Sequence, residues 1–163
     1  MAMRAGIEGD VDLMLLLGQA SHVLTTELTA GLVEVGITPR AHCVLAHALS
    51  GDLTQSELAE ACGLDKTTMV VTLDELEHAG LARRQLSSTD RRARIVSVTA
   101  AGRRKVAQAD AIVTRVYSDV LSVLPAGERH AFVNALRRLV GVRLSTPVQC
   151  EPPVRRRRVA RAS

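Results

Sequence analysis

The chain has 163 residues, which leaves room for one compact domain with flanking helices but not for a large multidomain enzyme. Apolar residues make up 47% of the sequence and aromatic residues only 1%, so the core must be built mainly from Leu, Val and Ala, which favours helices. The net charge of +4 hides a segregation, because residues 1–65 carry two basic and nine acidic side chains whereas residues 83–105 carry eight basic and one acidic, which indicates a surface suited to a polyanion.

The first fifty residues predict two helices. Apolar side chains recur at helical spacing over residues 11–32, and Thr38 before Pro39 is a suitable N-cap for a second helix that runs to about Leu49. The longest apolar stretch near the start, residues 13–17, is far shorter than the roughly 20 residues that span a bilayer, and acidic residues precede it in place of a basic leader. We therefore expect a cytoplasmic protein with no membrane partner.

The middle of the chain predicts two short helices joined by a tight turn. Thr54 followed three residues later by Glu57 is typical of a capping box, which starts a helix. Gly63 suits the turn that follows, and Asp65 is a suitable cap for the next helix. The small residue Ala59, four places before the glycine, completes the spacing of a helix-turn-helix, although an ordinary helical hairpin also explains these features.

A short β-hairpin is expected next. Residues 81–86 and 93–98 have the character of two strands, and a polar stretch joins them. Three arginines lie at or beside the tip of this hairpin: Arg91, Arg92 and Arg94. A purely structural loop has little reason to concentrate positive charge, although ordinary solvent exposure accounts for any one of them.

The rest of the chain predicts two further helices and a tail. Thr99 is expected to cap a long helix whose apolar positions continue to Leu124, and Pro125 with Gly127 would end it. A last helix carries Phe132 and several aliphatic residues. The proline residues and arginine run beyond it favour a mobile, basic tail.

Residues 53–106 resemble the core of the MarR family of bacterial transcription regulators. The stretches that carry the resemblance are LTQSELAEACGLDKTTMVVTLDELEHAGLARR and STDRRARIVSVTAAGRRKV. The resemblance implies a mainly α-helical winged helix-turn-helix fold with a small β-hairpin wing. It also implies a homodimer that represses transcription at a palindromic operator in double-stranded DNA and is released by a small organic effector. The implied organisation is N-terminal dimerisation helices and effector region at 1–50, a DNA-binding region at 51–99, C-terminal dimerisation helices at 100–146 and the tail at 147–163.

The same resemblance implies roles for individual residues at the DNA. The helix that begins at Lys66 would enter the major groove, where threonine hydroxyl and methyl groups suit base edges and phosphates. Arg92 matches the family arginine that reaches into the minor groove, and Asp90 would orient it. The residues expected to contact or organise contacts to DNA are Thr54, Gln55, Lys66, Thr67, Thr68, Thr72, Asp90, Arg91, Arg92 and Arg94. Val71 and Glu75 stand where many relatives carry basic residues, which leaves the operator sequence open.

The effector pocket of this family lies where the first, second and fifth helices meet. In this chain that region holds His22, Arg40, His42, Cys43 and His47. Cys43 and His47 are four residues apart and would share a helix face, but a metal site needs at least one more ligand, and half-buried packing residues explain the pair more simply. We therefore predict no metal and no cofactor.

The chain contains three cysteines: Cys43, Cys62 and Cys150. They are too few and too unevenly spaced for a disulfide framework or a CxxC zinc site, so we expect buried or spare thiols. A peroxide-sensing thiol is disfavoured because the branch of the family that uses one places it early in the first long helix.

Two other classes of function were weighed against a regulator. An enzyme is disfavoured because the sequence has no nucleophile elbow, phosphate loop or HExxH pattern. A winged-helix module that serves architectural DNA binding or protein association without an effector is the other alternative. Sequence-selective, salt-dependent DNA binding would distinguish a regulator from such a scaffold.

Overall fold

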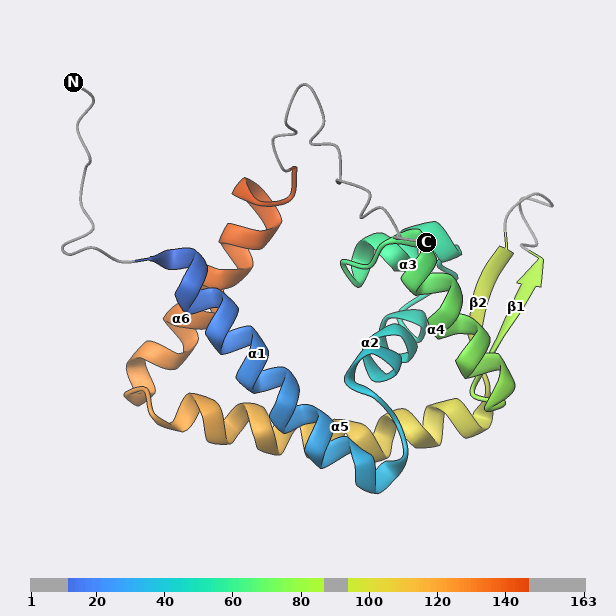
Figure 1. Ribbon diagram of the computed structural model, residues 1–163, viewed down its shortest axis with the longest axis horizontal. Helices are drawn as coiled ribbons and strands as arrows, with labels where there is room; N and C mark the ends of the chain where they lie inside the picture. Colours follow the sequence, from blue (N-terminus) through green and yellow to red (C-terminus); the bar gives the residue numbers. More distant parts are fainter. Residues whose placement is uncertain (1–11, 87–93, 147–163) are drawn as a thin grey trace, which may run out of the picture. The chain divides into compact units, whose positions relative to one another are not determined.

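The computed structural model describes residues 12–86 and 94–146. These residues form a mainly helical fold with one β-hairpin, as predicted (Figure 1). The elements in chain order are α1 (Leu13–Leu32), η1 (Val33–Val35), α2 (Pro39–Ala48), α3 (Gln55–Ala61), α4 (Lys66–His78), β1 (Ala82–Leu86), β2 (Arg94–Val98), α5 (Ala100–Ser122), α6 (Ala126–Arg138) and η2 (Leu139–Arg143). Among them, none combines the length and apolar character needed to cross a membrane.

The chain divides into two compact units. The first unit extends to Ser118 and contains the elements α1 to β2 together with most of α5. The second unit begins at Asp119, within the last turn of α5. The predicted basic tail at 147–163 and three residues of the hairpin tip, Asp90, Arg91 and Arg92, lie outside the described residues.

Polar side chains set the starts of the helices where the sequence predicts them. Asp12 accepts a hydrogen bond from the backbone N–H of Leu15 (2.9 Å) at the start of α1. Thr38 accepts one from the N–H of Ala41 (3.1 Å) at the start of α2. Such side chains satisfy N–H groups that have no partner within their own helix, which explains why these helices begin at these residues.

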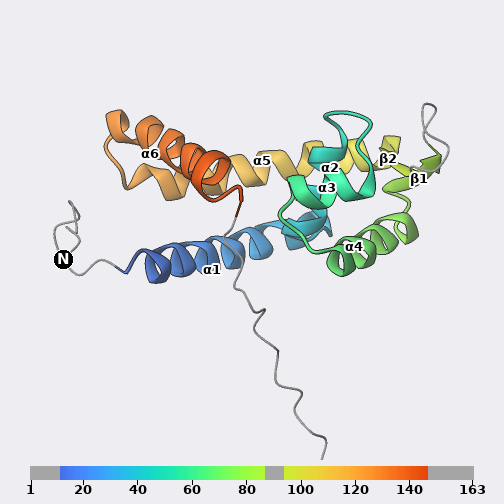
Figure 2. The ribbon, with the colours of Figure 1, turned by 90° about the horizontal axis from the view of Figure 1, so that it is seen from above.

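Helix α2 lies at the centre of the first unit. It contacts α1, α3, α4 and β2, and its Val44 and Leu45 are fully buried (Figure 2). Helix α5 completes the core with three of the apolar residues expected to face inward, Val106, Ala109 and Val113. Burial of these aliphatic side chains provides the main stabilisation of a unit with almost no aromatic residues.

The hairpin is antiparallel, with Ala82 opposite Val98 at its base and Leu86 opposite Arg94 at its open end. The N–H of Val96 also donates to the carbonyl of Leu53 (3.1 Å). Strand β2 is therefore bonded on both edges, which fixes the hairpin to the segment that leads into α3.

A glycine allows α5 to start close against the hairpin base. A Cβ atom added at Gly102 would collide with the carbonyl oxygen of Leu81 and lie 2.6 Å from a methyl group of Val98. The N–H of Gly102 donates to the hydroxyl of Thr99 (3.0 Å), the predicted cap of this helix. Only a residue without a side chain fits at this contact.

The structure of the second unit differs from the prediction at the end of α5. Helix α5 ends at Ser122, where the side chain of Arg129 donates to the carbonyls of Ser122 (3.2 Å) and Leu124 (2.9 Å). Pro125 precedes α6 as its N-cap residue, and Gly127 lies in the first turn of α6 instead of ending α5. Proline suits the start of a helix because its missing N–H would have no partner there.

Candidate nucleic-acid interface and effector region

The capping box predicted at Thr54 fixes the start of α3. The N–H and the hydroxyl of Thr54 each donate to the carboxylate of Glu57 (2.8 Å), and the N–H of Glu57 donates back to Thr54 (3.3 Å). These hydrogen bonds from Thr54 hold the pKa of Glu57 below its usual value. The first helix of the helix-turn-helix is thereby anchored at Gln55, which is half-buried.

The turn between α3 and α4 depends on Gly63, which has a φ of 62°. Asp65 then caps α4, where it accepts hydrogen bonds from the N–H (2.9 Å) and the hydroxyl (2.7 Å) of Thr68. These bonds lower the pKa of Asp65 and keep the carboxylate charged at the helix start. Asp65 is therefore a cap, as predicted.

The predicted contact residues of α4 do not all face the same way. Lys66 and Thr67 are exposed in its first turn. Thr68 is half-buried and its hydroxyl is already bonded to Asp65. Lys66 and Thr67 are thus the two members of the predicted set on α4 that are free to reach a DNA groove.

Thr72, which the family pattern places at the DNA, is not among the exposed side chains of α4. This residue is only 2% exposed, and its hydroxyl donates to the carbonyl of Thr68 (2.8 Å) within the helix. It lies on the buried face of α4 with Met69, Leu73 and Leu76. The side chains that α4 does expose beyond its first turn include Val70 and Val71, which the sequence analysis did not assign to the interface.

Arg84 of β1 ties the hairpin to α4. Its guanidinium forms ion pairs with Glu77 (2.6 Å) and Asp74 (2.7 Å), and it also donates to the carbonyl of Val70 (3.2 Å). The backbone N–H of Arg84 donates to Glu77 as well (2.6 Å). The hairpin and α4 consequently lie side by side, as Figures 1 and 2 show.

Not every arginine or lysine of the basic segment is available to a polyanion. Arg84 has only 17% of its side chain exposed, Arg103 donates to the carbonyl of Val98 (2.9 Å), and Lys105 donates to the carbonyl of Val35 (2.7 Å). By contrast, Arg94 is exposed at the open end of the hairpin. The charge count of the sequence therefore overstates the positive surface of the described residues.

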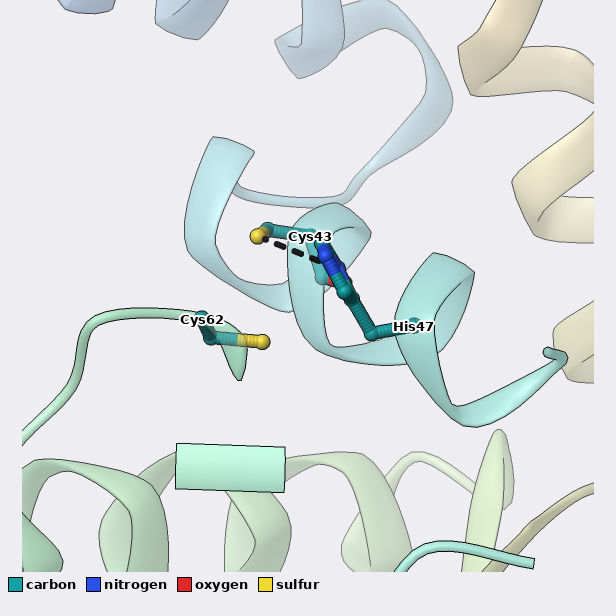
Figure 3. Close-up of side chains that lie close together, drawn as sticks. All are labelled: Cys43, His47 and Cys62. Carbon is teal, nitrogen blue, oxygen red and sulfur yellow. Dashed lines mark hydrogen bonds between the residues drawn. The ribbon is translucent and has the colours of Figure 1, made fainter. Parts of the chain in front are cut away.

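The five predicted effector residues are divided among several environments. His22 is exposed on α1, and Arg40 is exposed in the first turn of α2. The Nε2 atom of His42 lies 2.8 Å from a carboxylate oxygen of Asp110, which joins α2 to α5. Cys43 and His47 lie close to Cys62 at the end of α3 (Figure 3). The structure does not gather the five side chains around one centre.

Cys43 and His47 instead form a cluster with Cys62, the C-cap residue of α3 (Figure 3). The Sγ atom of Cys43 lies 3.6 Å from Nδ1 of His47, and the ligand atoms of all three residues lie within 4.8 Å of one another. Burial, with a smaller effect from the neighbouring Cys43, raises the pKa of the Cys62 thiol to about 12. This cluster was not predicted, since Cys62 was expected to be a buried or spare thiol without a partner from α2.

Comparisons with known proteins agree with the motif and the geometry. The model of the MarR family matches residues 35–93. CouR from Rhodococcus jostii RHA1, solved with p-coumaroyl-CoA, is 26% identical with a TM-score of 0.73, over 85% of this chain and 95% of that one.

Two further solved structures extend the comparison. The transcriptional repressor CouR bound to a 23-mer DNA duplex is 27% identical with a TM-score of 0.73, over 86% of this chain and 99% of that one. A MarR family protein of Mycobacterium tuberculosis in complex with p-aminosalicylic acid is 29% identical with a TM-score of 0.65, over 79% of this chain and 98% of that one. The matches cover nearly the whole length of these proteins.

Proposed function

The chain belongs to the MarR family of winged helix-turn-helix transcription regulators, and on that premise we propose that it is a homodimeric repressor released from a palindromic operator by a small organic effector. As a DNA-binding regulator of this family it is not an enzyme. The observation that carries the proposal is the pairing of α4, with Lys66 and Thr67 exposed at its start, and a hairpin that Arg84 fixes beside it.

We assign DNA reading to residues 51–99. Lys66 and Thr67 would meet the major groove, and the half-buried Gln55 at the start of α3 would meet the phosphates through its side chain and backbone N–H. Thr54, whose N–H and hydroxyl are bonded to Glu57, would organise this contact by fixing the start of the helix. The exposed Val70 and Val71 suit contact with thymine methyl groups, which an apolar side chain can recognise without a hydrogen bond.

The wing would supply the second set of contacts. Arg94 is exposed at the open end of the hairpin and suits a phosphate. For Arg91, Arg92 and Asp90 the family pattern gives the roles: Arg92 in the minor groove, Asp90 as its partner and Arg91 at the backbone. Because Arg84 holds the hairpin to α4, helix and wing would engage adjacent grooves as one body.

Dimerisation is assigned to the helices at 1–50 and 100–146. At the start of α1 five consecutive apolar side chains, those of residues 13–17, are all exposed. The second unit independently exposes apolar side chains, among them Phe132, Val140 and Val142. Exposed apolar surface of this kind is typical of a protein interface, and a second copy of the chain would bury it.

The effector is proposed to bind where α1, α2 and α5 meet. CouR has been solved with p-coumaroyl-CoA, which is the thioester of an organic acid. The Mycobacterium tuberculosis protein has been solved with p-aminosalicylic acid, which is an organic acid. In this chain, the His42 and Asp110 pair between α2 and α5 offers polar groups that could orient such a molecule. Of the other predicted residues, His22 and Arg40 are exposed and could contact it, whereas Cys43 and His47 face α3.

The wing assignment is tested with Arg92→Ala. Duplex fragments bound by the purified protein are first selected from its native genome, and one recovered fragment is then titrated by fluorescence anisotropy. We expect Arg92→Ala to weaken binding at least about fivefold, because loss of one specific arginine contact costs about 1–3 kcal/mol.

Arg115→Ala, at an exposed position of α5, is the matched control and should bind as the unmodified protein does. Light scattering should show an intact dimer for both variants. Unchanged affinity in Arg92→Ala would refute the role of the wing. If no organic acid weakens binding to the selected fragment, release by such an effector is refuted. Binding that is neither sequence-selective nor salt-dependent identifies a winged-helix scaffold instead of a regulator.

A further inference from the structure

We propose that Cys43, His47 and Cys62 bind a thiophilic metal ion of the Zn²⁺ class, and that this ion couples the helix-turn-helix to α2 (Figure 3). The residues come from two separate segments, since Cys43 and His47 lie on α2 and Cys62 closes α3. Nothing in the proposed release by an organic acid uses Cys62.

The spacing of the ligand atoms fits a metal before any ion is bound. For tetrahedral Zn²⁺ with Zn–S of about 2.3 Å and Zn–N of about 2.0 Å, the sulfur and nitrogen ligands stand about 3.5 Å apart and two sulfurs about 3.8 Å apart. The Sγ atom of Cys43 lies 3.6 Å from Nδ1 of His47, and the three ligand atoms lie within 4.8 Å of one another. Small side-chain movements are enough to bring these three of the four ligands to coordination distance.

The donor set determines the kind of metal. Two thiolates and one imidazole are soft to intermediate ligands that favour Zn²⁺ or Cu⁺ over Mg²⁺ or Ca²⁺. Among the described residues no fourth His, Cys, Asp or Glu joins the cluster. Water or another small ligand would therefore take the fourth position around Zn²⁺, as in Zn²⁺ sites with three protein ligands.

Binding has a defined proton balance. Each thiol releases its proton to solvent as its Sγ–metal bond forms. In this structure, Nδ1 of His47 lies 2.9 Å from the carbonyl oxygen of Cys43, to which its N–H donates a hydrogen bond. To coordinate through Nδ1, the imidazole must break this bond and carry its proton on Nε2 instead.

A disulfide between the two cysteines is the competing use of this cluster. It would require an oxidant, and the attacking group would have to be a thiolate. Burial raises the pKa of Cys62, which disfavours attack on a peroxide by that thiol. The imidazole beside the two sulfurs has no part in a disulfide but completes a metal site.

The position of the site indicates what the metal would do. Cys62 immediately precedes the turn at Gly63, and Lys66 opens α4 four residues after Cys62. An ion bound to Cys62 and α2 would restrain the turn from which the DNA-reading helix starts. The effect on operator affinity rests on the proposed function, whereas metal binding itself does not.

Metal binding is tested with Co²⁺, which reports thiolate ligands through a charge-transfer absorption, on reduced, tag-free, full-length protein. We expect one Co²⁺ per chain, displaced by Zn²⁺. Cys43→Ser and Cys62→Ser should each lose the absorption or bind about 100-fold more weakly, since even changes outside the first ligand shell weaken metal binding about 10–100-fold. Cys150→Ser and His130→Gln remove a thiol and an imidazole that are not among the three proposed ligands, and both variants should bind as the unmodified protein does.

Circular dichroism of the metal-free variants checks their fold, and Cys62→Ala replaces Cys62→Ser if the latter is unfolded. The site is overturned if the unmodified protein gives no thiolate absorption, or if Cys62→Ser binds Co²⁺ as tightly as the unmodified protein does. It is also overturned if Cys150→Ser alone abolishes it.

The coupling is tested by titrating a selected operator fragment with and without Zn²⁺. We expect a change in affinity of about fivefold or more, absent in Cys62→Ser. Zn²⁺ binding without such a change refutes the coupling and leaves the site. Failure to bind any duplex refutes the proposed repressor, while the Co²⁺ spectrum still decides the metal site.

Discussion

Two threonines on α4 have opposite surroundings and should respond oppositely to the same substitution. Thr67→Val removes an exposed hydroxyl and is expected to weaken operator binding about threefold to tenfold, with no change in stability. Thr72→Val removes a buried hydroxyl bonded to Thr68, so it should change the free energy of unfolding by about 1 kcal/mol and leave operator affinity unchanged. Anisotropy titrations and urea denaturation of both variants measure the two effects. If Thr72→Val loses operator affinity without any change in stability, Thr72 contacts DNA.

The sequence contained the signal that places Thr72 in the core. Thr72 follows Met69 by three residues and precedes Leu76 by four, so all three share one helix face. Its position in the family motif nevertheless suggested a DNA contact. For Cys62 no such signal exists, because its contact with α2 arises only when distant segments pack together.

At the scale of elements, the base of the hairpin depends on the absence of a side chain at Gly102. Gly102→Ala would place a methyl group against the backbone of Leu81 and is expected to destabilise the fold by about 1–3 kcal/mol. Gly127→Ala is the matched control, since it lies in a helix with open space around it and should be neutral or slightly stabilising. Thermal unfolding followed by circular dichroism separates the two. If both variants are equally stable, the hairpin base tolerates a methyl group at position 102.

Most element boundaries could be predicted because their causes are local. Asp65 and Thr68, like Thr54 and Glu57, are three residues apart, so the sequence alone places donor and acceptor within reach. Arg84 shows the opposite case. Its partners Asp74 and Glu77 are on another element, so the sequence did not distinguish this structural arginine from those available to DNA.

For the whole molecule, the proposed dimer makes the exposed start of α1 essential to operator binding. Leu16→Glu places a charge among the exposed apolar side chains of residues 13–17 and is expected to yield a monomer that binds a palindromic fragment far more weakly. Thr26→Glu, at an exposed polar position of the same helix, is the control and should remain dimeric. Light scattering and anisotropy provide the measurements. A dimeric Leu16→Glu protein would exclude this part of α1 from the interface.

The ion pairs of Arg84 with Asp74 and Glu77 hold the strands of the wing to α4. Arg84 sits between the base and the open end of β1, and its bonds to α4 do not involve the segment that joins the two strands. In the proposed mode of DNA binding, substitutions in that segment would alter the minor-groove contacts during evolution while α4 stays fixed beside the hairpin.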